Sequence, residues 1–204
     1  MSSTIFQKVK DAIGDEKRSS TWYRNKVRQF AVAGGYGINP DKLILDERRD
    51  RTKPKDQEDP EELRKYTRKG RIFLFDYNPL YAPKMDYYDK FPLVYVIKYL
   101  PDGFYGINLH YLPYKRRLLF INALKENKVI ALKSCIHRYL TKYKESILFE
   151  VAEEDWETAI YLPVDEFVTN VAGIEVPRRK EEVWQDILRK PQNYYRGSRI
   201  VGKY

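Results

Sequence analysis

The chain has 204 residues, 43% hydrophobic and 15% aromatic, which suffices for one medium-sized domain with a core but not for two full domains. Its single cysteine, Cys135, excludes an intramolecular disulfide and fits folding in a reducing cytoplasm. No run approaches the roughly 18 apolar residues that a membrane span needs, and the first residues lack the apolar stretch of a secretory signal. We therefore expect a soluble protein with no membrane partner.

The net charge of +9 is spread unevenly along the chain. Lys and Arg exceed Asp and Glu by four in residues 1–68, equal them in residues 69–176 and exceed them by five in residues 177–204. A neutral body with basic ends predicts that the ends contact a polyanion or an acidic protein surface. Basic tails that only keep the protein soluble are the alternative.

Two short helices are predicted in the N-terminal segment 1–45. The first runs from Ser3 and stops at Gly14, and the second begins at Ser20 or Thr21, whose hydroxyls can cap a helix. Their narrow apolar faces cannot form a core alone, so they are expected to dock on the central domain or on another protein. Trp22 and Tyr23 of the second helix are candidates for a partner surface.

Residues 46–69 are almost wholly charged and are predicted to form an exposed linker or an arm laid on a partner.

The central segment 70–176 holds the densest aromatic and branched runs, cut by Pro and Gly. Strands are predicted at 71–77, 91–100 and 103–110, and the Asp102-Gly103 step indicates a hairpin turn between the last two. This order predicts a small, strongly bent antiparallel sheet of the SH3-like barrel kind. The expected fold class is α+β, with flanking helices and extended termini.

Helices are predicted at 114–125, at 131–143 and at 178–188, and a strand at 147–151. The run from Ile160 to Pro163 is expected to lead into a further short helix that ends near Val168. The helix at 131–143 follows from apolar residues spaced three and four apart. Residues 177–204 are expected to form a basic C-terminal helix and a tail, in which the part after Pro191 has little to hold it.

No cofactor and no metal site is expected. Cys135 and His137, two residues apart on one predicted helix, would point in different directions, which argues against a Cys–His pair. His110 is expected to hydrogen-bond within the sheet. An acidic group, Asp76, Asp86 and Asp89, could hold a divalent ion, but charge-rich turns produce such groups by chance.

An enzyme is not expected, although one alternative stays open. Pro101-Asp102 followed by Glu126-Asn127-Lys128 matches the PD…ExK arrangement of metal-dependent nucleases, whose carboxylates hold Mg²⁺. Asp102 lies in a predicted turn and Glu126 at a helix end, whereas this chemistry needs both on neighbouring strands. No phosphate-binding loop of the Walker or Rossmann type is present.

Basic clusters predict contact with double-stranded DNA, independent of sequence, or with an acidic neighbouring subunit. A free regulatory nucleic-acid-binding protein is a further alternative. The loop between Tyr77 and Phe91 contains more tyrosine side chains than a short hairpin can bury. Tyr81, Tyr87 and Tyr88 are therefore predicted to form a partner surface. The basic candidates are Lys115, Arg116, Arg117, Arg178, Arg179, Lys180, Arg196, Arg199 and Lys203.

The runs YYDKFPL at 87–93 and GFYGINLHYLP at 103–113 resemble a segment of small virion proteins of large contractile-tailed bacteriophages. The most similar of these are described as DNA end protector or head-completion proteins, and the resemblance covers about residues 70–170. It implies a bacteriophage structural protein made in the host cytoplasm and located in the virion, at the head–tail connector region. Portal, neck or tail subunits would be its partners, and it would act in phage assembly as part of a symmetric oligomer. It implies no catalytic residue.

Overall fold

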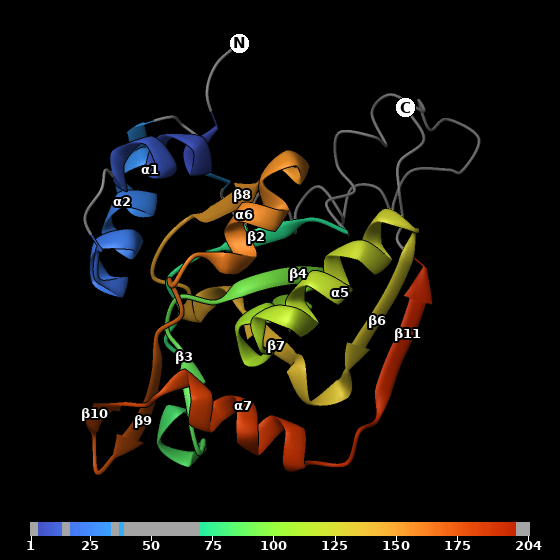
Figure 1. Cartoon of the computed structure of the whole chain (residues 1–204). Helices are drawn as coiled ribbons and strands as arrows, with labels where there is room; N and C mark the ends of the chain where they lie inside the picture. Colours follow the sequence, from blue (N-terminus) through green and yellow to red (C-terminus); the bar gives the residue numbers. More distant parts are fainter. Residues whose placement is uncertain (1–3, 14–16, 34–36, 39–69, 199–204) are drawn as a thin grey trace.

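The computed structural model describes residues 4–13, 17–33, 37–38 and 70–198. Within them the chain is a mixed α+β structure with antiparallel sheets (Figure 1), as the sequence predicts. The predicted arm at 46–69 and the tail residues Arg199 and Lys203 lie outside the described residues.

The largest sheet has six strands in the order β1-β8-β2-β4-β5-β7, with antiparallel neighbours throughout. The predicted hairpin is confirmed, because the two longest strands pair from Leu100 and Gly103 back to Val94 and Asn108. Gly103 is needed at this turn, since a Cβ there would lie 1.9 Å from the carbonyl oxygen of Tyr139. The strands are β1 (Gly37–Ile38), β2 (Ile72–Leu74), β4 (Leu93–Leu100), β5 (Gly103–Asn108), β7 (Ile136–Leu140) and β8 (Leu148–Val151).

This sheet is strongly bent, as predicted. Phe75, which follows β2, packs on Tyr139 of β7 with ring centroids 5.3 Å apart, although β4 and β5 lie between these strands. In a flat sheet the two strands would be roughly 14 Å apart, three spacings of about 4.8 Å. The described strands do not close into a barrel, and a single bridge from Tyr77 to Lys144 joins the segments that follow β2 and β7. The SH3-like detail stays a prediction.

The observed strand pairing overturns three local predictions. Residues 131–143 do not form one helix, because they supply the end of one strand, a 3-10 turn at Lys133–Cys135 and then β7. The segment after Pro191 is held, since Tyr194–Ser198 pairs with Lys128–Leu132. Val168 lies in a strand and not at a helix end. The sheets are β10-β9-β3, from β3 (Tyr88–Asp89), β9 (Phe167–Val171) and β10 (Ile174–Pro177), and β11-β6, from β6 (Lys128–Leu132) and β11 (Tyr194–Ser198).

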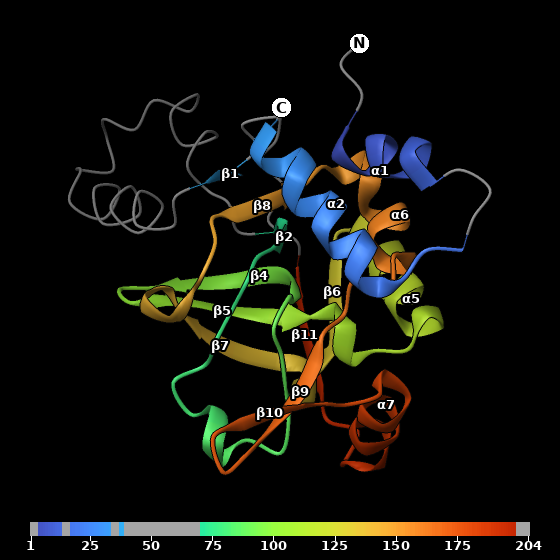
Figure 2. The same ribbon diagram turned by 90° about the vertical axis from the view of Figure 1, so that its left-hand side faces the viewer.

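Most of the predicted helices are present. The N-terminal pair, the helix after Pro113 and the last helix lie within a few residues of their predicted bounds, and the strand predicted at 147–151 is β8. Figure 2 shows α1, α2 and β8 at one end of the molecule and α7 with β9 and β10 at the other. The helices are α1 (Ile5–Ile13), α2 (Ser20–Ala33), α5 (Tyr114–Lys125), α6 (Trp156–Tyr161) and α7 (Lys180–Arg189).

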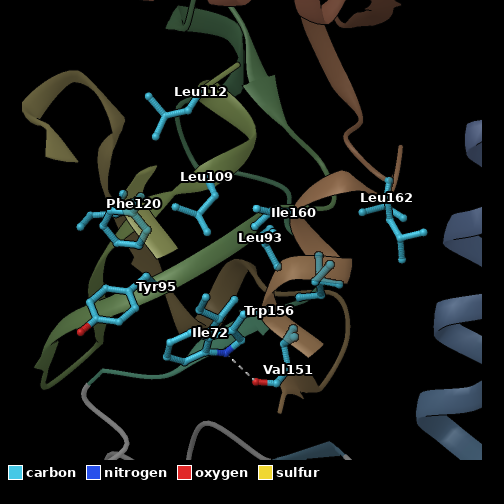
Figure 3. Close-up of a cluster of buried hydrophobic side chains, with 14 of the residues drawn as sticks. Ile72, Leu93, Tyr95, Leu109, Leu112, Phe120, Val151, Trp156, Ile160 and Leu162 are labelled. Atoms are coloured by element: carbon cyan, nitrogen blue, oxygen red, sulfur yellow. Dashed lines mark hydrogen bonds between the residues drawn. The ribbon is translucent and has the colours of Figure 1, made fainter. Parts of the chain in front are cut away.

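The main hydrophobic core lies between one face of the six-stranded sheet and the helices (Figure 3). Tyr95 of β4 packs edge-on against Phe120 of α5, with ring centroids 5.4 Å apart. Trp156 donates its indole N–H to the carbonyl of Val151 at 3.1 Å, so its polar atom is satisfied inside the core. Apolar residues of α1 and α2 belong to the same cluster, so both helices dock on the central part of the chain.

The opposite face of the sheet carries a second, mostly aromatic cluster. Side chains alternate along a strand, so Ile72 and Leu74 enter the main core while Phe73 enters the other cluster. Both faces of this sheet are therefore buried, which explains its continuous apolar runs. The second cluster contains Phe73, Phe75, Tyr77, Val94, Val96, Tyr99, Phe104, Tyr139 and Leu148.

Candidate functional site: an apolar groove with basic residues

A buried carboxylate, Asp89, lies at the end of β3. Its Oδ1 accepts hydrogen bonds from the backbone N–H groups of Phe91 (3.1 Å) and Glu166 (3.2 Å), and its Oδ2 accepts one from Asn108 Nδ2 (3.1 Å). Oδ2 also lies 2.8 Å from His110 Nδ1. Burial raises the pKa of Asp89, but His110 and these hydrogen bonds outweigh it, and the net pKa is lowered. The ionised carboxylate thus joins three segments of the chain, which is a structural role for both Asp89 and His110.

The acidic group considered as a metal site does not converge. Asp76 is paired with Arg28 of α2, Asp89 is engaged as described, and Asp86 is exposed. Among the described residues no group of three His, Cys, Asp or Glu side chains could hold a metal ion.

Cys135 and His137 do not form a catalytic pair. Cys135 is buried in the main core, and burial raises the pKa of its thiol to about 12. Such a thiol is protonated at neutral pH and is a poor nucleophile. Burial lowers the pKa of His137, on β7, to about 4, so this imidazole is uncharged at neutral pH.

The PD…ExK residues are separate from one another in the fold. Asp102 lies in the β4–β5 turn and contacts Arg138 at 2.5 Å, while Glu126 caps the end of α5 and contacts Lys128 at 2.8 Å. Each carboxylate is paired with its own cation, and neither lies within a strand. The two-strand arrangement that this nuclease chemistry requires is not present at these residues.

Arg117 is a correction to the first basic cluster, because it is wholly buried. Its guanidinium donates hydrogen bonds to the carbonyls of Leu112 (2.7 Å), Ile160 (2.9 Å) and His110 (3.1 Å). It also lies 4.7 Å from the ring centroid of Tyr114. A side chain held in this way cannot contact DNA or a partner, so Arg117 is a structural residue.

The second basic cluster, at the start of α7, is largely neutralised by the acidic residues that surround it. Arg178 lies 3.5 Å from Glu182 and 3.4 Å from Asp186. Arg179 and Lys180 contact Glu181 (3.7 Å) and Asp165 (3.6 Å), respectively. We therefore expect this cluster to attract a polyanion only weakly.

The structure places Arg116 next to the segment that leads into β11, the strand that carries Arg196. Arg116 of α5 donates a hydrogen bond to Gln192 Oε1 at 3.3 Å, just before β11. Arg196 lies on β11 opposite Ile130 of β6, and side chains directly opposite in an antiparallel pair share a face. Lys115 is exposed at the start of α5. Among the described residues Lys115, Arg116 and Arg196 form no ion pair.

Helix α5 lies beside the β6–β11 pair (Figure 1). Residues of these elements line a groove of about 380 Å³, which we call the α5–β11 groove. Its exposed lining is apolar and includes Leu119, Ile130 and Tyr194, and Arg116 also lines it. Leu119 is 67% exposed and lines the groove together with Ile130 and Tyr194, which are also exposed, so the groove presents several apolar side chains and not a single one. The groove could not be predicted from the sequence, because it depends on the pairing of β6 with β11.

Among the three loop tyrosines predicted to form a partner surface, only Tyr81 is exposed, and whether a partner binds there stays a prediction. Tyr81 is 60% exposed, whereas Tyr87 and Tyr88 are buried. Tyr88 donates its hydroxyl to Glu175 Oε1 at 2.8 Å, and burial raises the pKa of Tyr87 to about 12. Tyr23 packs against the main core, and Trp22 is half-buried and lies edge-on to Tyr23.

No protein-family model, no curated protein and no solved structure matches this chain. The resemblance to bacteriophage virion proteins therefore remains an expectation from the sequence. None of the described helices has the length and apolar character needed to cross a membrane.

Proposed function

We propose that this protein is a non-enzymatic structural protein of a tailed-phage virion that acts in assembly of the head–neck–tail region. It docks on a neighbouring, acidic subunit through the α5–β11 groove, and symmetry of the particle sets its oligomeric state. The resemblance at 87–93 and 103–113 supports the location in the particle. The groove supports the docking role.

The observation that carries the proposal is the combination of apolar and basic side chains in one place. Leu119, Ile130 and Tyr194 leave apolar surface exposed at the groove. Around it lie Arg116 and Arg196, whose charges no described acidic residue offsets. An apolar centre with a polar or charged rim is the usual composition of a protein–protein interface.

Charge and composition together favour a protein partner over DNA at this surface. The cations attract a negative partner, and both a phosphate backbone and an acidic protein face meet that requirement. Phosphate contacts, however, leave no role for an exposed leucine and isoleucine between the cations. An acidic segment that carries an apolar anchor side chain satisfies both features. Sequence-independent contact with the end of the genome is then a second use of the same cations.

Mass spectrometry of purified particles tests the location of the protein. We expect it as a stoichiometric component of virions that remains after washing in high salt. Its absence from particles would reject the structural role and favour a free nucleic-acid-binding regulator. In a parallel assay, the purified protein with Mg²⁺ should leave plasmid DNA intact, and Asp102→Ala and Glu126→Ala should change nothing.

A further inference from the structure

A second cavity, of about 480 Å³, lies against the edge strand β7. All five residues of β7 line it, and the opposite wall is the segment between β2 and β3. Figure 2 shows this segment running from β2 past β4, β5 and β7 toward β10. The volume falls in the range of small-molecule sites, roughly 300 to 1,000 Å³.

The lining of this cavity is aromatic to an unusual degree. Five tyrosines contribute to it, together with Leu80 and Met85. Four of these tyrosines are buried and belong to the packed structure, so the walls are preformed. Tyr81 alone among them is largely exposed, at 60%. The tyrosines are Tyr77, Tyr81, Tyr88, Tyr111 and Tyr139.

The charged groups of the cavity are already occupied. Each oxygen of Asp89 has two partners, and Asp102 is paired with Arg138 at 2.5 Å. The lining therefore offers no spare charge to a cation or an anion. This excludes ligands that bind mainly through charge and favours an uncharged one.

His137, one of the lining residues, carries a buried polar atom that lacks a partner among the described residues. This atom is Nε2 of the imidazole ring. The imidazole is neutral at neutral pH, because burial lowers its pKa to about 4. The ring lies 4.6 Å from that of Tyr111, which holds it in place. A buried polar atom without a partner is destabilising, so a ligand that bonds to it gains affinity.

From these features we propose that the cavity beside β7 binds an uncharged planar heterocycle of nucleobase size, which stacks on tyrosine and hydrogen-bonds to His137 Nε2. Stacking on aromatic side chains suits any flat heterocycle, and each stacked base contributes roughly 1–3 kcal/mol in nucleic-acid-binding proteins. The base comes from a free nucleoside or from an unpaired nucleotide of a strand. This inference does not depend on the docking role of the groove.

Titration of the isotope-labelled full-length protein with adenosine, guanosine, cytidine and thymidine, and separately with a short single-stranded oligodeoxynucleotide, tests this proposal. We expect amide shifts in NMR spectra to concentrate at residues 136–140, with a dissociation constant below about 1 mM for at least one probe. Tighter binding of the oligonucleotide identifies a strand as the source, and tighter binding of a nucleoside identifies the free compound.

Two variants and a matched control make the result specific. Tyr81→Ala removes an exposed stacking surface and should weaken binding at least fivefold. His137→Phe keeps an aromatic ring but removes the nitrogen that bonds to the ligand, and it should also weaken binding at least fivefold. Tyr105→Ala removes an exposed tyrosine that does not line the cavity and should leave the affinity unchanged. Absence of shifts with every probe, or equal weakening by Tyr81→Ala and Tyr105→Ala, overturns the proposal.

Discussion

Arg116 and Arg117 are consecutive residues of α5, yet Arg116 reaches Gln192 at the surface whereas Arg117 is wholly buried against three backbone carbonyls. One is available to a partner and the other holds the fold together. The two neighbours therefore represent the two roles of basic residues in this protein, contact with a partner and stabilisation of the fold.

Arg117→Ala should lower the free energy of unfolding by about 3 to 5 kcal/mol, because it leaves three buried carbonyls without their charged donor. Arg116→Ala should change it by no more than about 0.5 kcal/mol. Urea unfolding followed by tryptophan fluorescence measures both. Similar values for the two variants would contradict the assignment of Arg117 as a structural residue.

Asp89→Asn should lower the melting temperature by roughly 5 to 10 °C, because an amide cannot accept all the hydrogen bonds that the ionised carboxylate accepts. The matched control is Asp86→Asn, three residues earlier and exposed, which should leave the melting temperature within about 1 °C of wild type. Circular dichroism during heating provides the measurement. An unchanged melting temperature for Asp89→Asn would show that the buried carboxylate does not tie the segments together.

Stability should decrease as the pH falls from about 6.5 to about 4, because of His137. Its pKa is about 4 in the folded protein, below the ordinary value near 6.5, so the unfolded chain takes up the proton first in this window. The loss approaches about 3 kcal/mol at the lower limit. Asp89, whose pKa is lowered in the folded protein, adds a separate loss below about pH 4.

Denaturant unfolding of the wild type and of His137→Phe at several pH values isolates the contribution of His137. The variant should show a flatter dependence between pH 6.5 and 4, while both proteins should lose stability below pH 4. Parallel curves through the upper window would indicate that His137 is protonated in the folded protein.

If the protein contacts DNA, the exposed unpaired cations should determine how binding depends on salt. Replacement of Lys115, Arg116 and Arg196 by alanine should reduce the slope of log affinity against log salt by roughly 2 to 3, since each phosphate contact contributes about 0.9. Replacement of Arg178, Arg179 and Lys180 should reduce it by less than about 1, because acidic neighbours already offset these charges. Fluorescence anisotropy with a labelled duplex measures both slopes, and the reverse order would contradict the placement of the binding surface.

The hairpin and the helix of residues 114–125 were predictable because their signals are local. Asp102-Gly103 specifies a turn, and Pro113 is a favourable residue at a helix start. The region 131–143 was mispredicted because Leu132, Cys135 and Tyr139 also match helical spacing. Long-range pairing of β6 with β11 and of β7 with β5 determines its structure, and no local pattern reports such pairing.

The groove and the burial of Arg117 illustrate the same limit at the level of the site. Arg117 is four residues before Ile121 and seven before Leu124, so it lies on the inward face of α5, and this spacing was a usable signal. The position of Arg196 opposite Ile130, a residue that lines the groove, was not predictable, because it requires β11 to pair with β6. The local spacing could therefore have identified Arg117 as buried, whereas the groove depends on long-range strand pairing that no local pattern reports.

Incorporation of variants into particles tests the central claim, that the α5–β11 groove docks the protein on a neighbouring subunit. Leu119→Glu places a negative charge in the groove, and Val32→Glu makes the same change on α2 at a residue that is 69% exposed, against 67% for Leu119. Both substitutions are at exposed sites, so both proteins should fold. The account predicts that particles assembled with Leu119→Glu contain at least tenfold less of the protein than those assembled with Val32→Glu. Equal incorporation of the two variants would contradict it.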